Sequence, residues 1–288
     1  MYITIDIGGT NTRIVAFKSL GSLKTFKIFK FKTQNNYKKN LEKIIKTIQE
    51  IKNFKIKGIS IGVPGVIKEG KIKKTPNLLG WKDKPISKDL GNFFKCPVIL
   101  GNDVLMAACV EAFYGYGQGK NFLFINWGTG IGGCRVQWSE KKIFLFPLEL
   151  GHQIIDWNNK IKCNCGQKGC WEAFCGYYGI QKQYKKEPKD LFLKEWKETI
   201  KNFSKGLFNL IILQPIDLII LTGGIGTNQR LRIKKIKQFL KEKLKIYSSI
   251  PEIKISKYKE NTCFYYSVAV FNILKKQKNI NGIFLNKF

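Results

Sequence analysis

The chain is organised around residues 149–172, which read Glu149-Leu150-Gly151-His152, then a spacer, then Cys163-Asn164-Cys165-Gly166-Gln167-Lys168-Gly169-Cys170-Trp171-Glu172. His152 is the only histidine, and three of the eight cysteines lie just downstream of it. Imidazole and thiolate are the ligands that zinc prefers, and four of them close a tetrahedral structural site. The glycines let the backbone turn tightly enough for the three sulfurs to face one point. The segment therefore predicts a structural zinc ion, with the ligands His152, Cys163, Cys165 and Cys170.

Two carboxylates, Glu149 and Glu172, flank the predicted ligands. A lone Cys-x-Cys or a lone histidine is usually an ordinary residue, so only their combination favours a metal. A fully ligated ion has no open position for chemistry, and its expected task is to hold a loop. The closed site needs no further carboxylate, so Glu149 and Glu172 suggest that something else binds beside the metal.

The length of 288 residues favours two lobes, and 44% hydrophobic residues suffice for packed cores. No apolar run approaches the ~18 residues of a membrane span. Met1 leads directly into an expected strand, so we expect no signal peptide. The other cysteines resemble buried thiols, not a disulfide framework, which suits a reducing cytosol. We therefore expect a cytoplasmic protein without a membrane partner.

The formal net charge is +31, which by itself suggests nucleic acid as a partner. However, the basic residues are nearly all lysines, and they are spread along the whole chain. This distribution favours a solvated lysine surface over a nucleic-acid footprint. We expect only weak, salt-sensitive attraction to polyanions and no specific nucleic-acid partner.

Two glycine hairpins stand about 120 residues apart. The first joins strands 2–7 and 13–17 through Gly8-Gly9-Thr10-Asn11-Thr12, and the second follows strand 122–127 with Gly128-Thr129-Gly130-Ile131-Gly132-Gly133. Their exposed backbone N–H groups suit phosphate oxygens, and Asp6 could act through a magnesium ion. One such hairpin is more often only a turn. The repetition predicts two similar lobes that face one nucleotide.

The remaining pattern is that of an α/β protein. We expect strands at 23–31, 56–63, 97–100 and 217–221, and helices at 37–51, 104–113, 191–213, 231–244 and 264–274. Strand 56–63 runs into the turn Pro64-Gly65, and strand 217–221 ends in a third glycine turn that contains Gly223 and Gly224. Asn102-Asp103 opens helix 104–113. These two residues are either ordinary helix caps or, for Asp103, a general base at the end of a strand.

With these pieces the chain resembles the ROK family of sugar kinases and sugar-responsive repressors. The similarity rests on Asp6-Ile7-Gly8-Gly9-Thr10, on Gly128-Thr129-Gly130-Ile131-Gly132, and above all on the segment 149–172. The resemblance implies an α/β fold of two ribonuclease-H-like lobes, the actin-like ATPase fold, with an interlobe cleft. We expect lobes at 1–115 and 116–288, with a C-terminal helix near 276–288 that can pack on the first. Departures from the family pattern are Leu148, Cys134 and Ser267.

The resemblance also assigns roles to individual residues. Asp103 corresponds to the catalytic base, and His152, Cys163, Cys165 and Cys170 to the zinc ligands. The predicted sugar ligands are Gly65, Asn77, Asn102, Asp103, Glu149, His152 and Glu172. The predicted ATP-binding residues are Asp6, Gly8, Gly9, Thr10, Asn11, Thr12, Gly128, Thr129, Gly130, Ile131, Gly132, Gly223 and Gly224.

The sequence thus predicts an ATP-dependent hexose kinase, with glucose as the best single substrate, O6 as the acceptor, Mg²⁺ bound with ATP, and a homodimeric state. One alternative is a ROK kinase for fructose, mannose or an N-acetylated hexosamine. Another is a sugar-responsive repressor, which would suit the basic charge but would need a DNA-binding helix-turn-helix before the first strand at Tyr2. A third is a non-catalytic sugar-binding protein.

Overall fold

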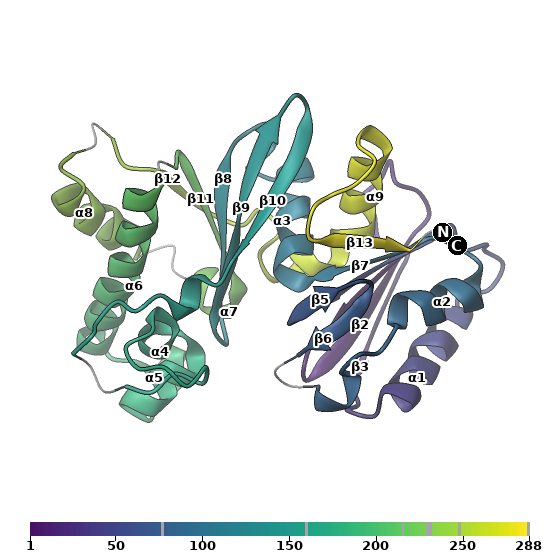
Figure 1. Cartoon of the computed structure of the whole chain (residues 1–288), viewed down its shortest axis with the longest axis horizontal. Coiled ribbons are helices and arrows are strands. Elements are labelled where there is room, and N and C mark those ends of the chain that lie inside the picture. The colour runs from purple at the N-terminus through teal and green to yellow at the C-terminus, as the bar shows by residue number, and fades with distance from the viewer. Residues whose placement is uncertain (76–77, 159–160, 215, 229–231, 247–248, 287–288) are drawn as a thin grey trace. The chain divides into compact units, whose positions relative to one another are not determined.

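The protein is described here by a computed structural model that covers residues 1–75, 78–158, 161–214, 216–228, 232–246 and 249–286. The chain divides into two compact units (Figure 1). The first unit comprises Met1–Gln118, Trp138–Phe146 and Asn261–Phe288, and the second comprises Gly119–Gln137 and Pro147–Glu260. Each unit is built around one sheet, although residues 138–146, which belong to strands of the second sheet, cluster with the first unit.

The sheet of the first unit has the strand order β13-β7-β4-β1-β2-β3. Its strands are β1 (Tyr2–Ile7), β2 (Asn11–Phe17), β3 (Lys27–Lys32), β4 (Gly58–Val63), β7 (Val98–Asn102) and β13 (Ile283–Asn286). Strands β1, β4 and β7 are parallel to one another, whereas β2, β3 and β13 are antiparallel to their neighbours. The parallel strands are nearly all buried, as expected where helices cover both faces.

Helices cover the two faces of this sheet. They are α1 (Tyr37–Gln49), α2 (Ile86–Phe94), α3 (Asp103–Tyr114) and α9 (Tyr266–Lys276). Alternate residues of β1, Ile3 and Ile5, pack in one apolar core with Ile44 and Ile48 of α1. A small two-stranded sheet, β5 (Val66–Lys68) and β6 (Lys71–Lys74), and the turn η1 (Leu79–Trp81) complete the unit.

Helix α9 packs on β4 through two glycines of the strand. A Cβ atom on Gly58 would lie 2.4 Å from the ring of Phe271, and one on Gly62 would lie 2.4 Å from the ring of Tyr266. The two aromatic rings therefore occupy the space that a side chain at either glycine position would need. Ser267, where the family usually has glycine, is fully buried and exchanges hydrogen bonds with Thr4 of β1, at 2.8 and 3.0 Å. The departure is thus accommodated within the packing of α9.

The sheet of the second unit has the order β10-β9-β8-β11-β12. Its strands are β8 (Phe122–Trp127), β9 (Ile131–Ser139), β10 (Lys142–Leu148), β11 (Leu218–Thr222) and β12 (Glu252–Ile255). The helices and helical turns are η2 (Leu150–His152), α4 (Trp171–Cys175), α5 (Tyr177–Tyr184), η3 (Pro188–Asp190), α6 (Leu193–Leu213), α7 (Gly223–Gly226) and α8 (Ile233–Lys243). The turn η4 (Lys259–Tyr265) begins at the end of the second unit and belongs mostly to the first. The order matches β3-β2-β1-β4-β7 of the first unit, so the two units repeat one topology.

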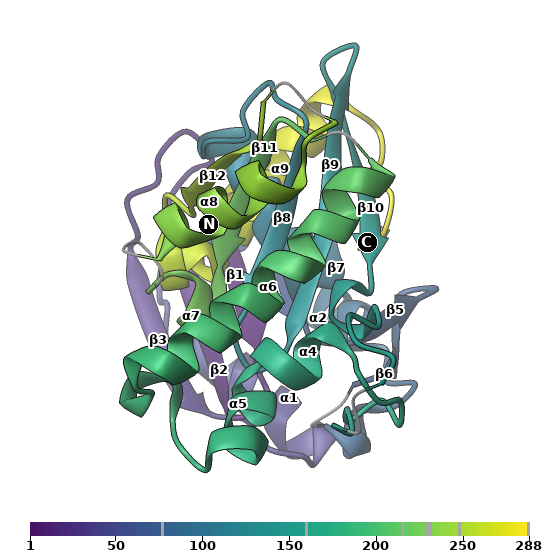
Figure 2. The same ribbon diagram turned by 90° about the vertical axis from the view of Figure 1, so that its left-hand side faces the viewer.

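The core of the second unit lies between this sheet and α6 with α8 (Figure 2). Trp127 at the end of β8 stacks on Phe203 of α6, with ring centroids 3.7 Å apart and planes inclined by 9°. The ring of Trp171 of α4 also contacts Phe203, with ring centroids 5.0 Å apart, so the three rings form an aromatic cluster. Gly206 makes room for this indole, because a Cβ atom there would lie 2.2 Å from the Trp171 ring. The cluster fixes α4 against α6.

The C-terminal segment differs from the sequence prediction. A helix was expected near 276–288, but α9 ends at Lys276, and Ile283–Asn286 forms strand β13. Strand β13 pairs antiparallel with β7, so β7 is no longer the edge strand of the sheet. Residues 261–288 consequently cluster with the first unit, although the expected boundary at 115/116 assigned them to the second.

Candidate functional site

The four predicted metal ligands converge in the second unit. One ligand atom from each of His152, Cys163, Cys165 and Cys170 lies within 4.8 Å of the other three. The Sγ atoms of Cys165 and Cys170 are 3.7 Å apart, as are Cys163 Sγ and His152 Nδ1. A tetrahedron with Zn–S bonds of about 2.3 Å has edges of about 3.8 Å. The donor types and spacings therefore fit zinc.

Local backbone bonds hold these ligands in place. The N–H of Cys163 donates to the Gln167 carbonyl at 2.8 Å, and Ile155 N–H donates to the Gly169 carbonyl at 2.9 Å. Gly166 and Gly169 have φ values of +97° and +76°, and a Cβ atom on Gly169 would lie 2.1 Å from the Asp156 carbonyl oxygen. Here glycine is required, as the sequence pattern predicted.

Glu149 and Glu172 differ in their surroundings. Glu149 is exposed, and its carbonyl accepts the His152 N–H at 3.1 Å, which closes the turn η2. Glu172 is half-buried on α4. Its Oε2 accepts the Ile131 N–H at 3.0 Å, and its Oε1 lies 3.7 Å from Cys163 Sγ. Glu172 therefore joins the metal ligands to the second glycine hairpin, a contact that sequence spacing could not reveal.

The glycine residues predicted to bind ATP in this unit lie together. Strands β8 and β11 are parallel neighbours, so their carboxyl ends bring the turn at 128–130 next to Gly223 and Gly224. A Cβ atom on Gly223, whose φ is +87°, would lie 2.3 Å from Asn126 Oδ1, and one on Gly128 would lie 3.5 Å from the Gly224 nitrogen. The third glycine turn is the short helix α7, not an open loop.

The first hairpin forms as predicted, with Asp6 opposite Arg13 and Ile7 opposite Thr12. The N–H of Gly8 donates to the Asn11 carbonyl at 2.9 Å. Thr10 is exposed at the tip, but Thr12 is fully buried, and its hydroxyl pairs with that of Thr33 at 2.9 Å. The Thr12 hydroxyl therefore supports the turn from within, and its contact with the nucleotide stays a prediction.

The carboxyl ends of β1, β4 and β7 bring the remaining predicted residues of the first unit to one edge of the sheet. Asp6 aligns with Gly62 on β4, and Val63 aligns with Asn102 on β7. Asn102 caps α3, since its Oδ1 accepts the Val104 N–H at 2.9 Å, and its Nδ2 donates to the Gly65 carbonyl at 3.0 Å. Asn102 thus serves as a cap, and it also ties α3 to the turn after β4.

Gly65 and Asn77 complete the predicted sugar ligands. Gly65 has a φ of +112°, and a Cβ atom there would lie 2.0 Å from the Lys74 carbonyl oxygen. Only glycine fits this turn without strain. Asn77 lies outside the described residues.

Asp103 is the first residue of α3. Its Oδ1 accepts the Val104 N–H at 3.0 Å, and its backbone carbonyl accepts the hydroxyl of Tyr266 at 3.2 Å. Burial raises the pKa of the Asp103 carboxyl to about 6, and the negative charge of Asp6 adds to the increase. A carboxylate with this pKa can take up a proton near neutral pH.

Asp6 is buried and forms an ion pair with Arg13, with Nη1 2.9 Å from Oδ2. Burial raises the pKa of Asp6, and the guanidinium of Arg13 opposes this increase. Arg13 was missed as a site residue, although the hairpin register alone places it opposite Asp6. Tyr266 was also missed, because it approaches Asp103 from the far end of the chain.

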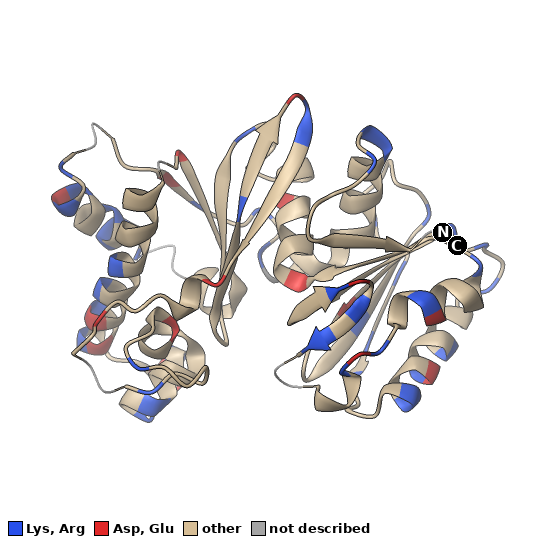
Figure 3. Ribbon diagram, viewed as in Figure 1, with Lys and Arg blue, Asp and Glu red and all other residues tan. Residues whose placement is uncertain are grey.

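Lysine and arginine residues are distributed over both units and are not gathered on one element (Figure 3). The basic residues are therefore spread along the fold, as they are along the sequence. Among the described residues, no helix has the length and apolar character needed to cross a membrane.

Comparisons with known proteins extend these observations. The ROK family model matches residues 2–264. The chain is 30% identical over 194 residues to a glucokinase of Halalkalibacterium halodurans, which covers 62% of this chain and 57% of that protein. It is 32% identical over 138 residues to the xylose repressor of Bacillus subtilis, which covers 46% of this chain and 35% of that protein. The chain thus spans between about a third and three fifths of these relatives.

Solved structures agree with the fold. A ROK family glucokinase from Streptomyces griseus, in complex with glucose and AMPPNP, matches with a TM-score of 0.72 at 19% identity over 94% of this chain and 98% of that chain. This likeness confirms the predicted fold class, the α/β actin-like ATPase fold. Because the family model also covers nearly the whole sequence, the chain belongs to the ROK family.

Proposed function

We propose that the protein is an ATP-dependent hexose kinase, with glucose as the first substrate to test and O6 as the acceptor atom. The observation that carries the proposal is Asp103, a half-buried carboxyl beside Asp6 at the carboxyl end of a parallel strand, with a pKa of about 6. Such a group is suited to accept a proton from a hydroxyl at neutral pH. The glucokinase relative and the similar structure that holds glucose and AMPPNP support the same reaction class.

In the proposed step, the sugar oxygen attacks the γ-phosphorus of ATP while its proton passes to the Asp103 carboxylate. A new oxygen–phosphorus bond forms, the bond to the β-phosphate bridging oxygen breaks, and ADP leaves. Backbone N–H groups of the two glycine hairpins would hold the phosphates. Positioning and electrostatic stabilisation then supply most of the rate. Magnesium bound with ATP would neutralise phosphate charge, with Asp6 as the carboxylate that faces it.

The metal segment would present the sugar ligands. When bound, zinc would supply only a structural anchor, since four protein ligands leave no open position. His152 lies with Nδ1 toward Cys163, which leaves Nε2 to meet a sugar hydroxyl. The carboxylates of Glu149 and Glu172 would accept hydrogen bonds from further hydroxyls, and the Asn102 amide would contact another. Within the same proposal the protein is cytoplasmic and homodimeric, and light scattering would measure its mass in solution.

A coupled assay of ADP release tests this function. Purified protein is given Mg-ATP with glucose, mannose, fructose, N-acetylglucosamine, N-acetylmannosamine or xylose. We expect sugar-dependent ADP release with one hexose preferred, and loss of most of it in Asp103→Asn. Absence of turnover with every sugar, while sugar binding persists by calorimetry, would leave a non-catalytic sugar-binding protein.

A sugar-responsive repressor is the second candidate, because a xylose repressor is among the relatives and the net charge is +31. The diffuse lysine distribution favours weak binding that falls steeply with salt. A gel-shift assay with genomic fragments at ~150 mM salt distinguishes the two functions. One tightly bound sequence, released by a sugar, would establish the repressor instead.

A further inference from the structure

Three hydrogen bonds join the second glycine hairpin to one short segment of the chain. The Gly128 carbonyl accepts the Tyr177 N–H at 3.0 Å. Glu172 Oε2 accepts the Ile131 N–H at 3.0 Å, and the Cys175 carbonyl accepts the Trp127 indole N–H at 2.7 Å. All three partners lie on α4 or at the first residue of α5. The hairpin therefore depends on the position of α4.

Helix α4 packs closely against the second glycine hairpin. A Cβ atom on Gly130 would lie 2.1 Å from Glu172 Oε2 of α4. One on Gly176 would lie 3.2 Å from the Thr129 carbonyl oxygen. Because α4 and the residue that ends it lie this close to the turn, we expect a shift of α4 to displace residues 128–131.

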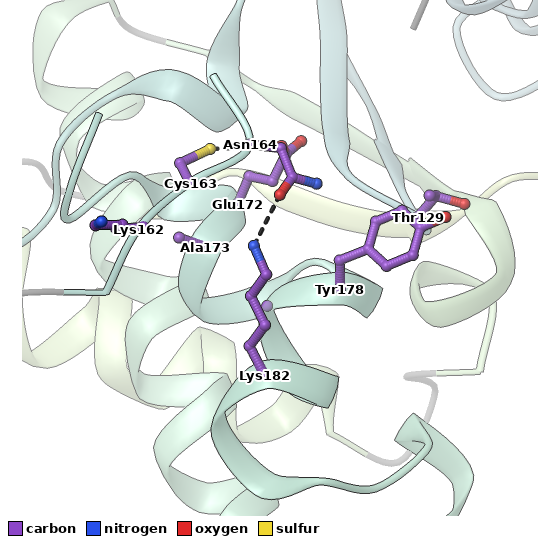
Figure 4. Close-up of a pocket in the computed structure, with 9 residues that line it drawn as sticks. Thr129, Lys162, Cys163, Asn164, Glu172, Ala173, Tyr178 and Lys182 are labelled. Carbon is purple, nitrogen blue, oxygen red and sulfur yellow. Dashed lines mark hydrogen bonds between the residues drawn. The ribbon is translucent and has the colours of Figure 1, made fainter. Parts of the chain in front are cut away.

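The metal ligands fix the same helix from its other end. Cys170 is the N-cap residue of α4 and bridges to Ile154 in antiparallel pairing. The Trp171 N–H donates to the Gln153 carbonyl, next to His152, at 2.8 Å. Figure 4 shows Glu172 in a hollow with Cys163 on one side and Thr129 on the other. A metal that draws the four ligands together therefore also sets the start of α4.

We propose that the metal cluster and the nucleotide are energetically linked through α4, so that each raises the affinity for the other. The linkage rests on the proposed nucleotide binding at residues 128–132. Both ligands stabilise one placement of α4, and thermodynamic reciprocity then requires equal effects in both directions. Couplings between sites are typically 5- to 150-fold, and we expect about 10-fold here. If the metal served only to present sugar ligands, nucleotide affinity would not depend on it.

Zinc release from the loaded protein tests the linkage without requiring the metal-free chain to fold. The zinc affinity is measured at equilibrium by competition with a chromophoric chelator, without sugar, at rising concentrations of Mg-AMPPNP. We expect saturating nucleotide to reduce zinc release by raising this affinity about 10-fold. The control Lys182→Gln loses a 2.8 Å contact to Asn164 in the metal loop but none to the hairpin, so it should keep the nucleotide dependence.

Glu172→Ala removes the hydrogen bond to Ile131, and Glu172→Gln keeps an acceptor oxygen of the same shape. We expect the nucleotide effect on zinc release to fall to about 2-fold or less in Glu172→Ala and to be retained in greater part in Glu172→Gln. The wild-type protein must first bind Mg-AMPPNP by calorimetry, and failure there overturns the proposed function. If it binds but zinc release is unchanged at saturation, the proposed function stands and the linkage is refuted.

Discussion

Asp103→Asn should make the protein more stable at neutral pH while removing its activity. The amide keeps the shape of the carboxyl, and its oxygen can still accept the Val104 N–H. In the wild type, burial and the charge of Asp6 raise the Asp103 pKa from 3.8 to about 6. A shift of about two pKa units corresponds to at most ~3 kcal/mol, and partial exposure to solvent lowers this, so we expect a gain of about 1–3 kcal/mol.

The pH dependence gives the sign of this effect. Asp103 has a higher pKa when folded, so the folded wild type binds more protons between about pH 4 and 6. Its contribution to stability is fully present below the unfolded pKa and is lost as the pH rises through about 6. Asn cannot ionise. The stability gain of the variant should therefore be near zero at pH 4 and complete above pH 6.

Urea unfolding of both proteins at a series of pH values measures this difference. In parallel, wild-type kcat/KM should fall about tenfold per pH unit below pH 6, because the base becomes protonated. The variant should lose about 10²–10⁴-fold in kcat. A variant that is less stable at pH 7.5, or one with undiminished turnover, would refute the assignment of Asp103 as a half-buried general base with a raised pKa.

Three further outcomes are expected. Asp6→Asn should move the acidic limb of the kcat/KM profile to lower pH, because it removes the negative charge that raises the Asp103 pKa. Purified protein should contain about one zinc per chain, and Cys165→Ser should lower zinc content and melting temperature together, as measured by metal analysis and calorimetry. Gly206→Ala should lower the free energy of unfolding by about 1–3 kcal/mol in urea titrations, since the new Cβ atom would overlap the Trp171 ring; an unchanged midpoint would contradict the packing described.

The elements that the sequence predicted well are those with a local signal. Alternating apolar residues and glycine turns identified both hairpins, and the Cys/His spacing brought four ligands to one point. The repeated hairpins also predicted two similar units, whereas the places of the other strands in the two sheets came from the structure. Helix α3 and its cap were also predictable, because Asn102-Asp103 is a common helix start.

The misses share a physical cause, which is a partner distant in sequence. Strand β13 exists because β7 offers an open edge about 180 residues earlier, and no local pattern shows this. Thr12 is buried where β3 pairs with β2, because Phe31 lies opposite it and its hydroxyl bonds to that of Thr33. The hydrogen bond from Ile131 to Glu172 spans 41 residues and depends on where α4 packs. Arg13 was missed for a different reason, because the register of the first hairpin already places it opposite Asp6 and the sequence alone could have identified it.

The return of residues 261–288 to the first unit has a consequence for synthesis on the ribosome. Gly119–Glu260 holds all of the second unit and emerges before α9 and β13 exist. Until then, β4 has no rings to fill the space over Gly58 and Gly62, and Thr4 lacks Ser267. Closure of contacts over more than 250 residues is slow and leaves apolar surface open to chaperones. The half of the molecule that is translated first is therefore the half that matures last.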